Sequence, residues 1–227
     1  MFSNKGESIM RKILISLGSL VLTFLLVCPN PIHSKELKEI KLLKPQMDGG
    51  RLLMQVLKDR HSSREFSTDE LPLQVLSNLL WAAFGINRPD SGKRTAPSAV
   101  NWQNIDIYVA MTKGLYLYDA KSNILKPVLA EDIRAATGTQ SFVKNVPVNL
   151  IYVADFSKIP RGTEEDKNFY SAAHTGFISQ NVYLYCASEG LATVVRGLVD
   201  REAMSKVMKL RPDQKVMFAQ SVGYTKK

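Results

Sequence analysis

The change of hydrophobic period along the chain constrains its fold more than any other feature. Apolar residues recur at helical spacing over residues 73–84, whereas apolar and polar residues alternate over residues 105–111. A period near 3.6 predicts an amphipathic helix, and a period of two predicts a strand. Stretches of both kinds follow one another, so we predict a single α+β domain in which helices flank a mixed sheet. The predicted helices are residues 51–59, 67–84, 131–136, 169–189 and 200–210, and the predicted strands are residues 105–111, 115–118, 124–128, 148–154, 191–195 and 216–223.

The N-terminal segment has the pattern of a targeting sequence. Arg11 and Lys12 precede an apolar run over residues 13–27, and the small residue Ser34 follows. This order is typical of a secretory signal peptide, with retention as an uncleaved membrane anchor as the alternative. We therefore predict an exported protein, periplasmic or otherwise extracytoplasmic, or else a membrane-anchored one. The predicted organisation is a signal peptide over residues 1–34, a leader over residues 35–50 and one domain over residues 51–227.

Charge and cysteine content exclude several classes of site. The net charge of +9 comes without a long basic block, which fits an anionic cofactor or surface and indicates no nucleic-acid partner. Cys28 lies in the N-terminal apolar run, so cleavage would leave only Cys186. One cysteine and few histidines support neither a disulfide nor a zinc site, and we predict no metal. Cys186 lies in an apolar helical pattern and is predicted to be a buried thiol.

Hydrogen-bond donors are concentrated in residues 60–66, Arg-His-Ser-Ser-Arg-Glu-Phe. Guanidinium groups match the oxygens of a phosphate, and hydroxyl groups fill its remaining lone pairs. The alternative is a solvated basic turn. A second polar segment, Ala-Pro-Ser-Ala-Val-Asn-Trp-Gln at residues 96–103, favours the anion site because its small side chains permit close approach to a ligand. The alternative there is an ordinary surface loop.

An ordered set of short motifs resembles the nitroreductase-like family of FMN-dependent flavoproteins. The resemblance covers about residues 51–224, and the hairpin that starts with Gly-Leu-Tyr-Leu-Tyr-Asp at residues 114–119 resembles the branch that contains azoline dehydrogenases. The other motifs are Arg-His-Ser-Ser-Arg at 60–64, Pro-Ser-Ala-Val-Asn-Trp-Gln at 97–103, Gln140 before Val-Pro-Val at 146–148, Gln-Asn at 180–181, Gly-Leu-Ala at 190–192, Arg-Gly at 196–197 and Val-Gly-Tyr at 222–224.

The resemblance implies a homodimer with two FMN sites between the subunits. It implies that residues 60–64 bind the phosphate, the ribityl chain and the pyrimidine end of the flavin. It also implies that residues 97–101 come from the other subunit and lie beside the flavin ring. The family often has an acidic residue where this chain has Arg196, so an arginine there would make the pocket more positive and favour an anionic substrate. The residues implied to bind FMN are Arg60, His61, Ser62, Arg64, Pro97, Ser98, Ala99, Asn101, Gln140, Val195, Arg196, Gly197 and Lys226.

The chemistry implied by the resemblance is ping-pong transfer of electrons or hydride from a donor such as NAD(P)H to a small organic acceptor. It requires no catalytic side chain, because the cofactor carries the reaction and the protein orients it. An exported protein would meet little NAD(P)H, so either the domain faces inward or another donor serves. Two alternatives remain open: a non-redox module that binds flavin or another anion, and an envelope protein whose basic surface meets anionic lipid.

Overall fold

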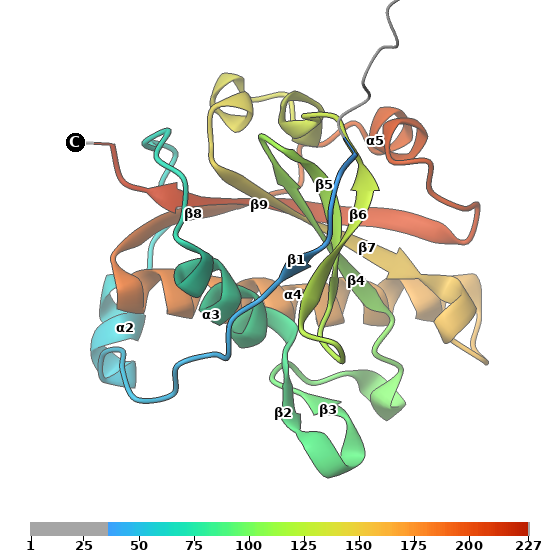
Figure 1. The fold of residues 1–227 in the computed structure, drawn as a ribbon. Helices are drawn as coiled ribbons and strands as arrows, with labels where there is room; N and C mark the ends of the chain where they lie inside the picture. Colours follow the sequence, from blue (N-terminus) through green and yellow to red (C-terminus); the bar gives the residue numbers. More distant parts are fainter. Residues whose placement is uncertain (1–35, 227) are drawn as a thin grey trace, which may run out of the picture. The chain divides into compact units, whose positions relative to one another are not determined.

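The structure, a computed structural model, describes residues 36–226. Within this range a seven-stranded sheet has the order β1-β6-β5-β4-β7-β9-β8, and β2 pairs with β3 in a separate hairpin (Figure 1). The predicted α+β class is confirmed. The helices are α2 (Leu53–Asp59), α3 (Leu73–Phe84), α4 (Glu164–Glu189) and α5 (Arg201–Val207), and the strands are β1 (Ile40–Lys41), β2 (Ile86–Arg88), β3 (Lys93–Arg94), β4 (Ile105–Met111), β5 (Gly114–Asp119), β6 (Ile124–Leu129), β7 (Val148–Asp155), β8 (Leu191–Arg196) and β9 (Gln214–Tyr224).

Strand direction differs from the predicted mixed sheet. All pairings among the described strands are antiparallel. The strands β7 and β8, which α4 connects, run parallel to each other, but β9 lies between them and is antiparallel to both. The insertion of the last strand between two parallel strands therefore removes every parallel neighbour from the sheet.

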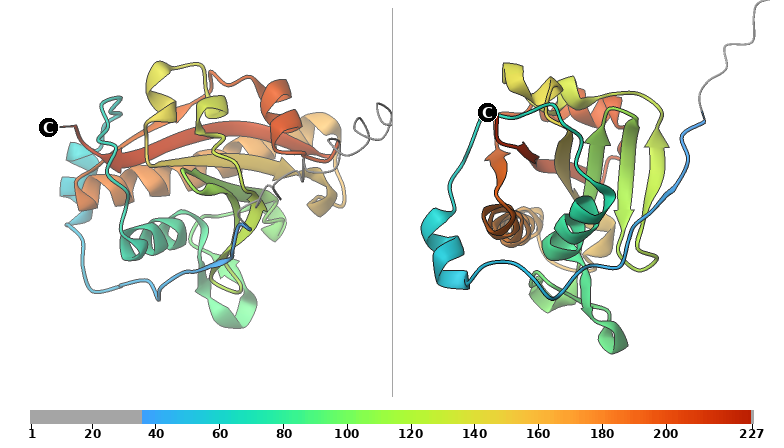
Figure 2. Two further views of the ribbon diagram at one scale, coloured as in Figure 1. Left: turned by 45° about the horizontal axis from the view of Figure 1, so that its top comes forward. Right: turned by 60° about the vertical axis from the view of Figure 1, so that its left-hand side comes forward.

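Two apolar cores lie on opposite faces of the sheet (Figure 2). On one face α3 and α4 bury Leu79 and Ile178 against Tyr152 of β7. On the other face α5 buries Met204 against Ile151, the preceding residue of the same strand. Because successive strand residues point to opposite faces, β7 contributes to both cores and is buried along its whole length. This central position makes the sheet a rigid base for the loops at its ends.

The long helix α4 is fixed at both ends by local sequence. The Thr163 hydroxyl accepts a hydrogen bond from the Asp166 N–H, and the Asp166 carboxylate accepts one from the Thr163 N–H. This capping box starts the helix at Glu164, earlier than the predicted residue 169. Gly190, with φ of 70°, ends it in the left-handed conformation that glycine adopts without a steric penalty.

Other predicted elements differ in their bounds. The helix predicted from residue 67 begins only after Pro72, because Ser67 bonds to Asp69 instead of capping a helix. The helix predicted at residues 131–136 is a short 3-10 turn, Arg134–Thr137. The hairpin of β2 and β3 was not among the predicted strands. No helix within residues 36–226 is long and apolar enough to span a membrane, and the predicted signal peptide falls outside the described residues.

Candidate functional site

The donor-rich segment of residues 60–64 is attached to the free edge of β8. The Ser63 N–H donates a hydrogen bond of 2.9 Å to the Thr193 carbonyl oxygen. One residue earlier, the Ser62 Oγ lies 2.8 Å from the hydroxyl of Tyr183 on α4. The same hydroxyl accepts a hydrogen bond of 2.9 Å from the Val195 N–H. A single phenol therefore joins the segment, the long helix and the end of β8.

The charged side chains of this segment remain accessible. Arg60 is half-buried with its guanidinium over the Tyr183 ring, at 5.3 Å from the ring centroid, and Arg64 is exposed. Among the ion pairs within residues 36–226, none involves either arginine. The exposed His61 donates from Nδ1 to the Asp59 carbonyl oxygen at 2.7 Å, because a carbonyl can only accept. Its Nε2 is then the free ring nitrogen.

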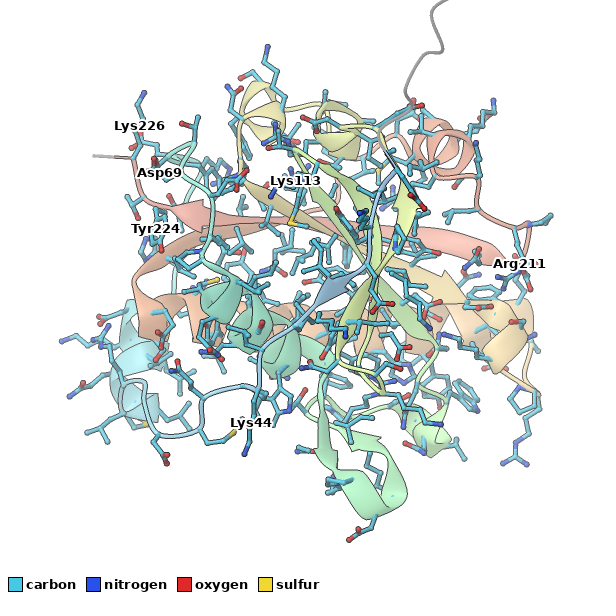
Figure 3. The ribbon with its side chains drawn as sticks, in the orientation of Figure 1. Lys44, Asp69, Lys113, Arg211, Tyr224 and Lys226 are labelled. Atoms are coloured by element: carbon cyan, nitrogen blue, oxygen red, sulfur yellow. The ribbon has the colours of Figure 1, made fainter. Side chains whose placement is uncertain are left out.

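The C-terminal end of the described chain lies beside this segment. Phe66 forms a β-bridge with Thr225, and the Lys226 N–H contacts the Glu65 carbonyl oxygen at 3.5 Å. Lys226 lies at the same corner of the molecule as Asp69 and Tyr224 (Figure 3), around a pocket of about 910 Å³. The backbone of Lys226 thus lies beside Glu65, the residue that follows the cationic segment, although more than 160 positions separate the two in sequence.

The Arg196 side chain takes a different direction from that expected of a pocket residue. Only 3% of Arg196 is exposed, and its guanidinium donates to the Thr137 carbonyl oxygen at 2.6 Å and to Asn149 Oδ1 at 3.0 Å. Burial lowers its pKa to about 10. Arg196 was predicted from the sequence to make the substrate pocket more positive. Its buried guanidinium is directed toward Asn149 of β7 and Thr137, so it does not contact a substrate directly.

Gln140 lies close to the same guanidinium. A Cβ at Gly138 would overlap the Arg196 guanidinium and come within 2.7 Å of Gln140 Oε1, so this approach requires glycine. Within the described residues, Gln140 Oε1 and Arg196 Nε are buried polar atoms without a hydrogen-bond partner. A buried polar atom without a partner is costly. Of these two residues, Gln140 is partly exposed, whereas Arg196 is buried.

The second predicted segment, residues 97–101, packs against the other half of α4. The Ala99 N–H donates a hydrogen bond of 2.7 Å to Nε2 of His174, and the Ser98 hydroxyl accepts one of 2.8 Å from the Gln103 N–H. Pro97 and Asn101 are exposed. The segment is therefore held by α4, and its small and polar side chains face solvent.

The two halves of the predicted site do not meet within one chain. Tyr183 supports the first half and His174 supports the second. The two residues are nine positions apart, which corresponds to about 13 Å along α4. In Figure 1 the first half follows α2 and the second follows the β2–β3 hairpin, and their supports lie in different halves of α4. The separation is what a site formed by segments from two subunits would produce.

Two supporting residues escaped the sequence analysis. Neither Tyr183 nor His174 is among the residues predicted to form the site. Their partners lie 121 and 75 positions away in sequence, so no local pattern reveals the contacts. The sequence signal nearest to Tyr183 was the Gln-Asn motif at residues 180–181 on the same helix.

Comparisons with known proteins agree on one family. The model of the nitroreductase family matches residues 57–224. A Methanocaldococcus jannaschii protein assigned as a nitroreductase is 31% identical over 170 residues, which cover 70% of this chain and 85% of that protein. The crystal structure of a protein from Ralstonia eutropha, also assigned as a nitroreductase, is 40% identical with a TM-score of 0.81, covering 84% of this chain and 91% of the other.

A more distant solved structure shares the fold of this chain. One chain of the E. coli microcin synthetase complex, solved with its truncated precursor peptide bound, has a TM-score of 0.64 and 18% identity. The match covers 99% of this chain and 95% of the other. At this identity the likeness shows the fold alone, so the azoline-dehydrogenase branch stays a prediction.

Proposed function

The chain belongs to the nitroreductase family and is an oxidoreductase, and we propose that it binds FMN and transfers electrons between a donor such as NAD(P)H and a small organic acceptor. The observation that carries this proposal is the Tyr183 hydroxyl, which holds Ser62 and Val195 together at 2.8 and 2.9 Å. It brings the cationic segment of residues 60–64 to the end of β8, where a flat ligand could lie along exposed backbone.

The donor set fits a phosphate-bearing cofactor. Arg60 and Lys226 would bind the phosphate, and Arg64 would lie near the pyrimidine end of the ring, where reduction leaves negative charge. Ser62 and His61 would add hydrogen bonds along the ribityl chain. Gln140 Oε1, which has no partner among the described residues, would accept a hydrogen bond from the same ligand.

At the end of β8 the ligand would meet backbone atoms, because no reactive side chain of the described residues is directed toward it. Arg196 is directed into the protein, and Gly197 next to it is exposed. Val195 is fixed by Tyr183, so the strand end has little freedom to move. FMN, when bound, supplies the hydride chemistry. The protein orients the ring against this backbone, places cations near its electron-rich end and limits access of water.

We also propose a homodimer, because one chain separates the two halves of the site. Exposed apolar side chains accompany both halves: Met54 on α2 is 76% exposed, and Phe169 on α4 is 68% exposed. Isolated apolar side chains at a surface need no explanation, but apolar side chains beside each half-site suit a self-complementary interface. A two-fold arrangement would place residues 97–101 of one subunit over residues 60–64 of the other.

The proposed location leaves the electron donor open. If the N-terminal segment directs export, as we propose, then a substrate oxidised directly or a membrane electron carrier would replace NAD(P)H. If the segment is an anchor and the domain faces the cytoplasm, NAD(P)H would serve. The binding geometry described above is the same in both cases.

The cationic cluster gives the most direct test by mutation. Arg60→Ala/Arg64→Ala should lower FMN affinity by about 100-fold or more, because each lost charge-assisted hydrogen bond is worth about 1.5–3 kcal/mol. Arg161→Ala/Lys121→Ala removes two exposed charges elsewhere and should leave affinity unchanged. Titration of each purified variant with FMN, followed by flavin fluorescence, measures the difference. Equal affinity in both double variants would show that the cluster does not hold the cofactor.

A further inference from the structure

We propose that His174 is a positioning residue that holds residues 98–103 in the conformation of the second half-site, and that only its neutral form does so. The inference rests on the proposed function in one respect, the assignment of residues 97–101 as a wall of the cofactor site. The link between His174 and the segment stands on the geometry alone.

Hydrogen bonding fixes the tautomer of His174. The Ala99 backbone N–H can only donate, so His174 Nε2, at 2.7 Å, must accept and carries no proton. The proton is then on Nδ1, which donates to Asn104 Oδ1 at 2.7 Å. The amide of Asn104 donates in turn to the Ser171 hydroxyl at 2.8 Å. Both ring nitrogens are therefore hydrogen-bonded, and the imidazole is neutral with its proton on Nδ1.

The segment that His174 holds is strained. Val100, Asn101 and Gln103 have φ of 48°, 58° and 47°. This left-handed region is unfavourable for residues with a side chain, and most of all for β-branched valine. Strain of this kind persists only where surrounding contacts over-determine the backbone. Besides His174, those contacts include Arg94, whose Nε donates to Gln103 Oε1 at 2.7 Å.

Protonation of His174 would break the contact. A proton on Nε2 would face the Ala99 N–H, so two donors would oppose each other at hydrogen-bond distance. The surroundings also disfavour the charge: 2% of His174 is exposed, and burial lowers the pKa of its imidazole. The groups that face it are the Trp102 and Tyr170 rings, 6.2 and 6.3 Å away between centroids, and the neutral Asn104 and Ser171. Within the described residues, no carboxylate contributes to the shift.

The sign of the pH effect follows from the lowered pKa. Release of the segment would relieve the burial that lowers the pKa of His174 from its ordinary value of 6.5, so the released form binds the proton more readily than the held form. The contribution of the contact is complete above about pH 6.5 and is lost as pH falls below it. Acid should therefore release residues 98–103 while the sheet stays folded.

Amide hydrogen exchange of the flavin-free protein tests this directly. Protection factors, corrected for intrinsic exchange, are compared at about pH 7.5 and about pH 5.5 for peptides covering residues 98–104, with residues 148–155 of β7 as the internal reference. In the wild-type protein, protection of residues 98–104 should fall at the lower pH, by at most about tenfold, with β7 unchanged.

Two variants separate positioning from general stability. His174→Gln keeps a neutral acceptor at every pH, so residues 98–104 should stay protected at both values. His174→Phe keeps a ring of similar size but removes the acceptor, so these residues should lose protection at both values. If His174→Gln shows the same fall with pH as the wild type, or if His174→Phe keeps wild-type protection, the proposal is overturned. If β7 of His174→Phe also loses protection, this variant has unfolded. The pH dependence of protection in His174→Gln then tests the proposal by itself.

An FMN titration of the same variants distinguishes this inference from the proposed function. Reduced FMN affinity in His174→Phe, with wild-type affinity in His174→Gln at about pH 7.5, would support the positioning role. Unchanged affinity in His174→Phe would overturn that role even if exchange increases. If no variant binds FMN but the exchange pattern is as expected, the proposed function fails while the contact between His174 and Ala99 stands.

Discussion

The hydroxyl of Tyr183 lies 2.8 Å from the Oγ of Ser62, although 121 positions separate the two residues in sequence. The same oxygen accepts the Val195 N–H at 2.9 Å. Through this one atom the long helix sets the distance between the cationic segment and the end of β8. The candidate site is therefore determined by a tertiary contact, and its local motifs become meaningful only once that contact is formed.

Removing the phenol oxygen should separate these two elements. Tyr183→Phe leaves the Val195 N–H without its acceptor, at a cost of about 1–3 kcal/mol, and should lower FMN affinity by about tenfold. The matched control is Tyr185→Phe on the same helix, which removes a hydrogen bond of 3.2 Å to the Val75 carbonyl oxygen instead of a contact with Ser62 or Val195. Titration with FMN should separate the two variants, and equal losses would mean that Tyr183 has no special role.

Close packing at Gly138 gives a prediction for stability. A methyl group there would overlap the Arg196 guanidinium, so Gly138→Ala should lower the free energy of unfolding by about 1–3 kcal/mol. Gly49→Ala is the control, because no atom lies within 4 Å of a Cβ at that position. Denaturant unfolding of the apo protein measures both changes. A Gly138→Ala variant as stable as the control would contradict the tight arrangement around Arg196.

The dimer proposal predicts a coupled loss of association and cofactor binding. Met54→Asp and Phe177→Asp introduce a charge on the exposed apolar side chains of α2 and α4, and each should shift the protein to monomers that no longer retain FMN. Val207→Asp on α5, also exposed but on the opposite face of the sheet, should remain dimeric. Sedimentation velocity gives the oligomeric state of each. Monomers with undiminished FMN affinity would be incompatible with a shared site.

Cys186 should be chemically inert in the folded protein. Its side chain is fully buried, and burial raises the pKa of the thiol, so the reactive thiolate is suppressed at neutral pH. Peptide-resolved alkylation should leave residue 186 unmodified until denaturant is added, and Cys186→Ser should keep most of the activity. Rapid labelling of Cys186 in the native protein would assign it a role that the structure does not provide.

Regular elements with a clear hydrophobic period were the easiest to predict. The strand at residues 105–111 was predicted with the bounds that β4 has, because its alternation is uninterrupted. The start of α4 was predicted too late, since the apolar pattern begins after the capping box at Thr163. The helix predicted at residues 51–59 has apolar side chains at helical spacing, but in one chain only Val56 of α2 is buried. A periodic pattern shows that a face is apolar and does not identify what covers it.

The candidate site was predictable only in part. Residues 60–64 and Lys226 were expected to act together from the resemblance to a family, and the structure places the backbone of Lys226 beside Glu65, the residue after this segment. The direction of Arg196 was not predictable, because it depends on which face of β8 the residue occupies and on the polar acceptors of Thr137 and Asn149. The support from Tyr183 was equally hidden, since it depends on a contact between distant segments.

The most direct measurement is the visible absorbance of the purified protein after incubation with FMN and removal of unbound cofactor, before and after anaerobic addition of NADPH. The proposed function predicts flavin bands at about one FMN per chain, which bleach if NADPH is the donor. Bands that persist would retain the FMN site but assign the reaction to another donor or the protein to a binding role. A folded protein that retains no flavin would contradict the central claim that residues 60–64, Tyr183 and the end of β8 form a cofactor site.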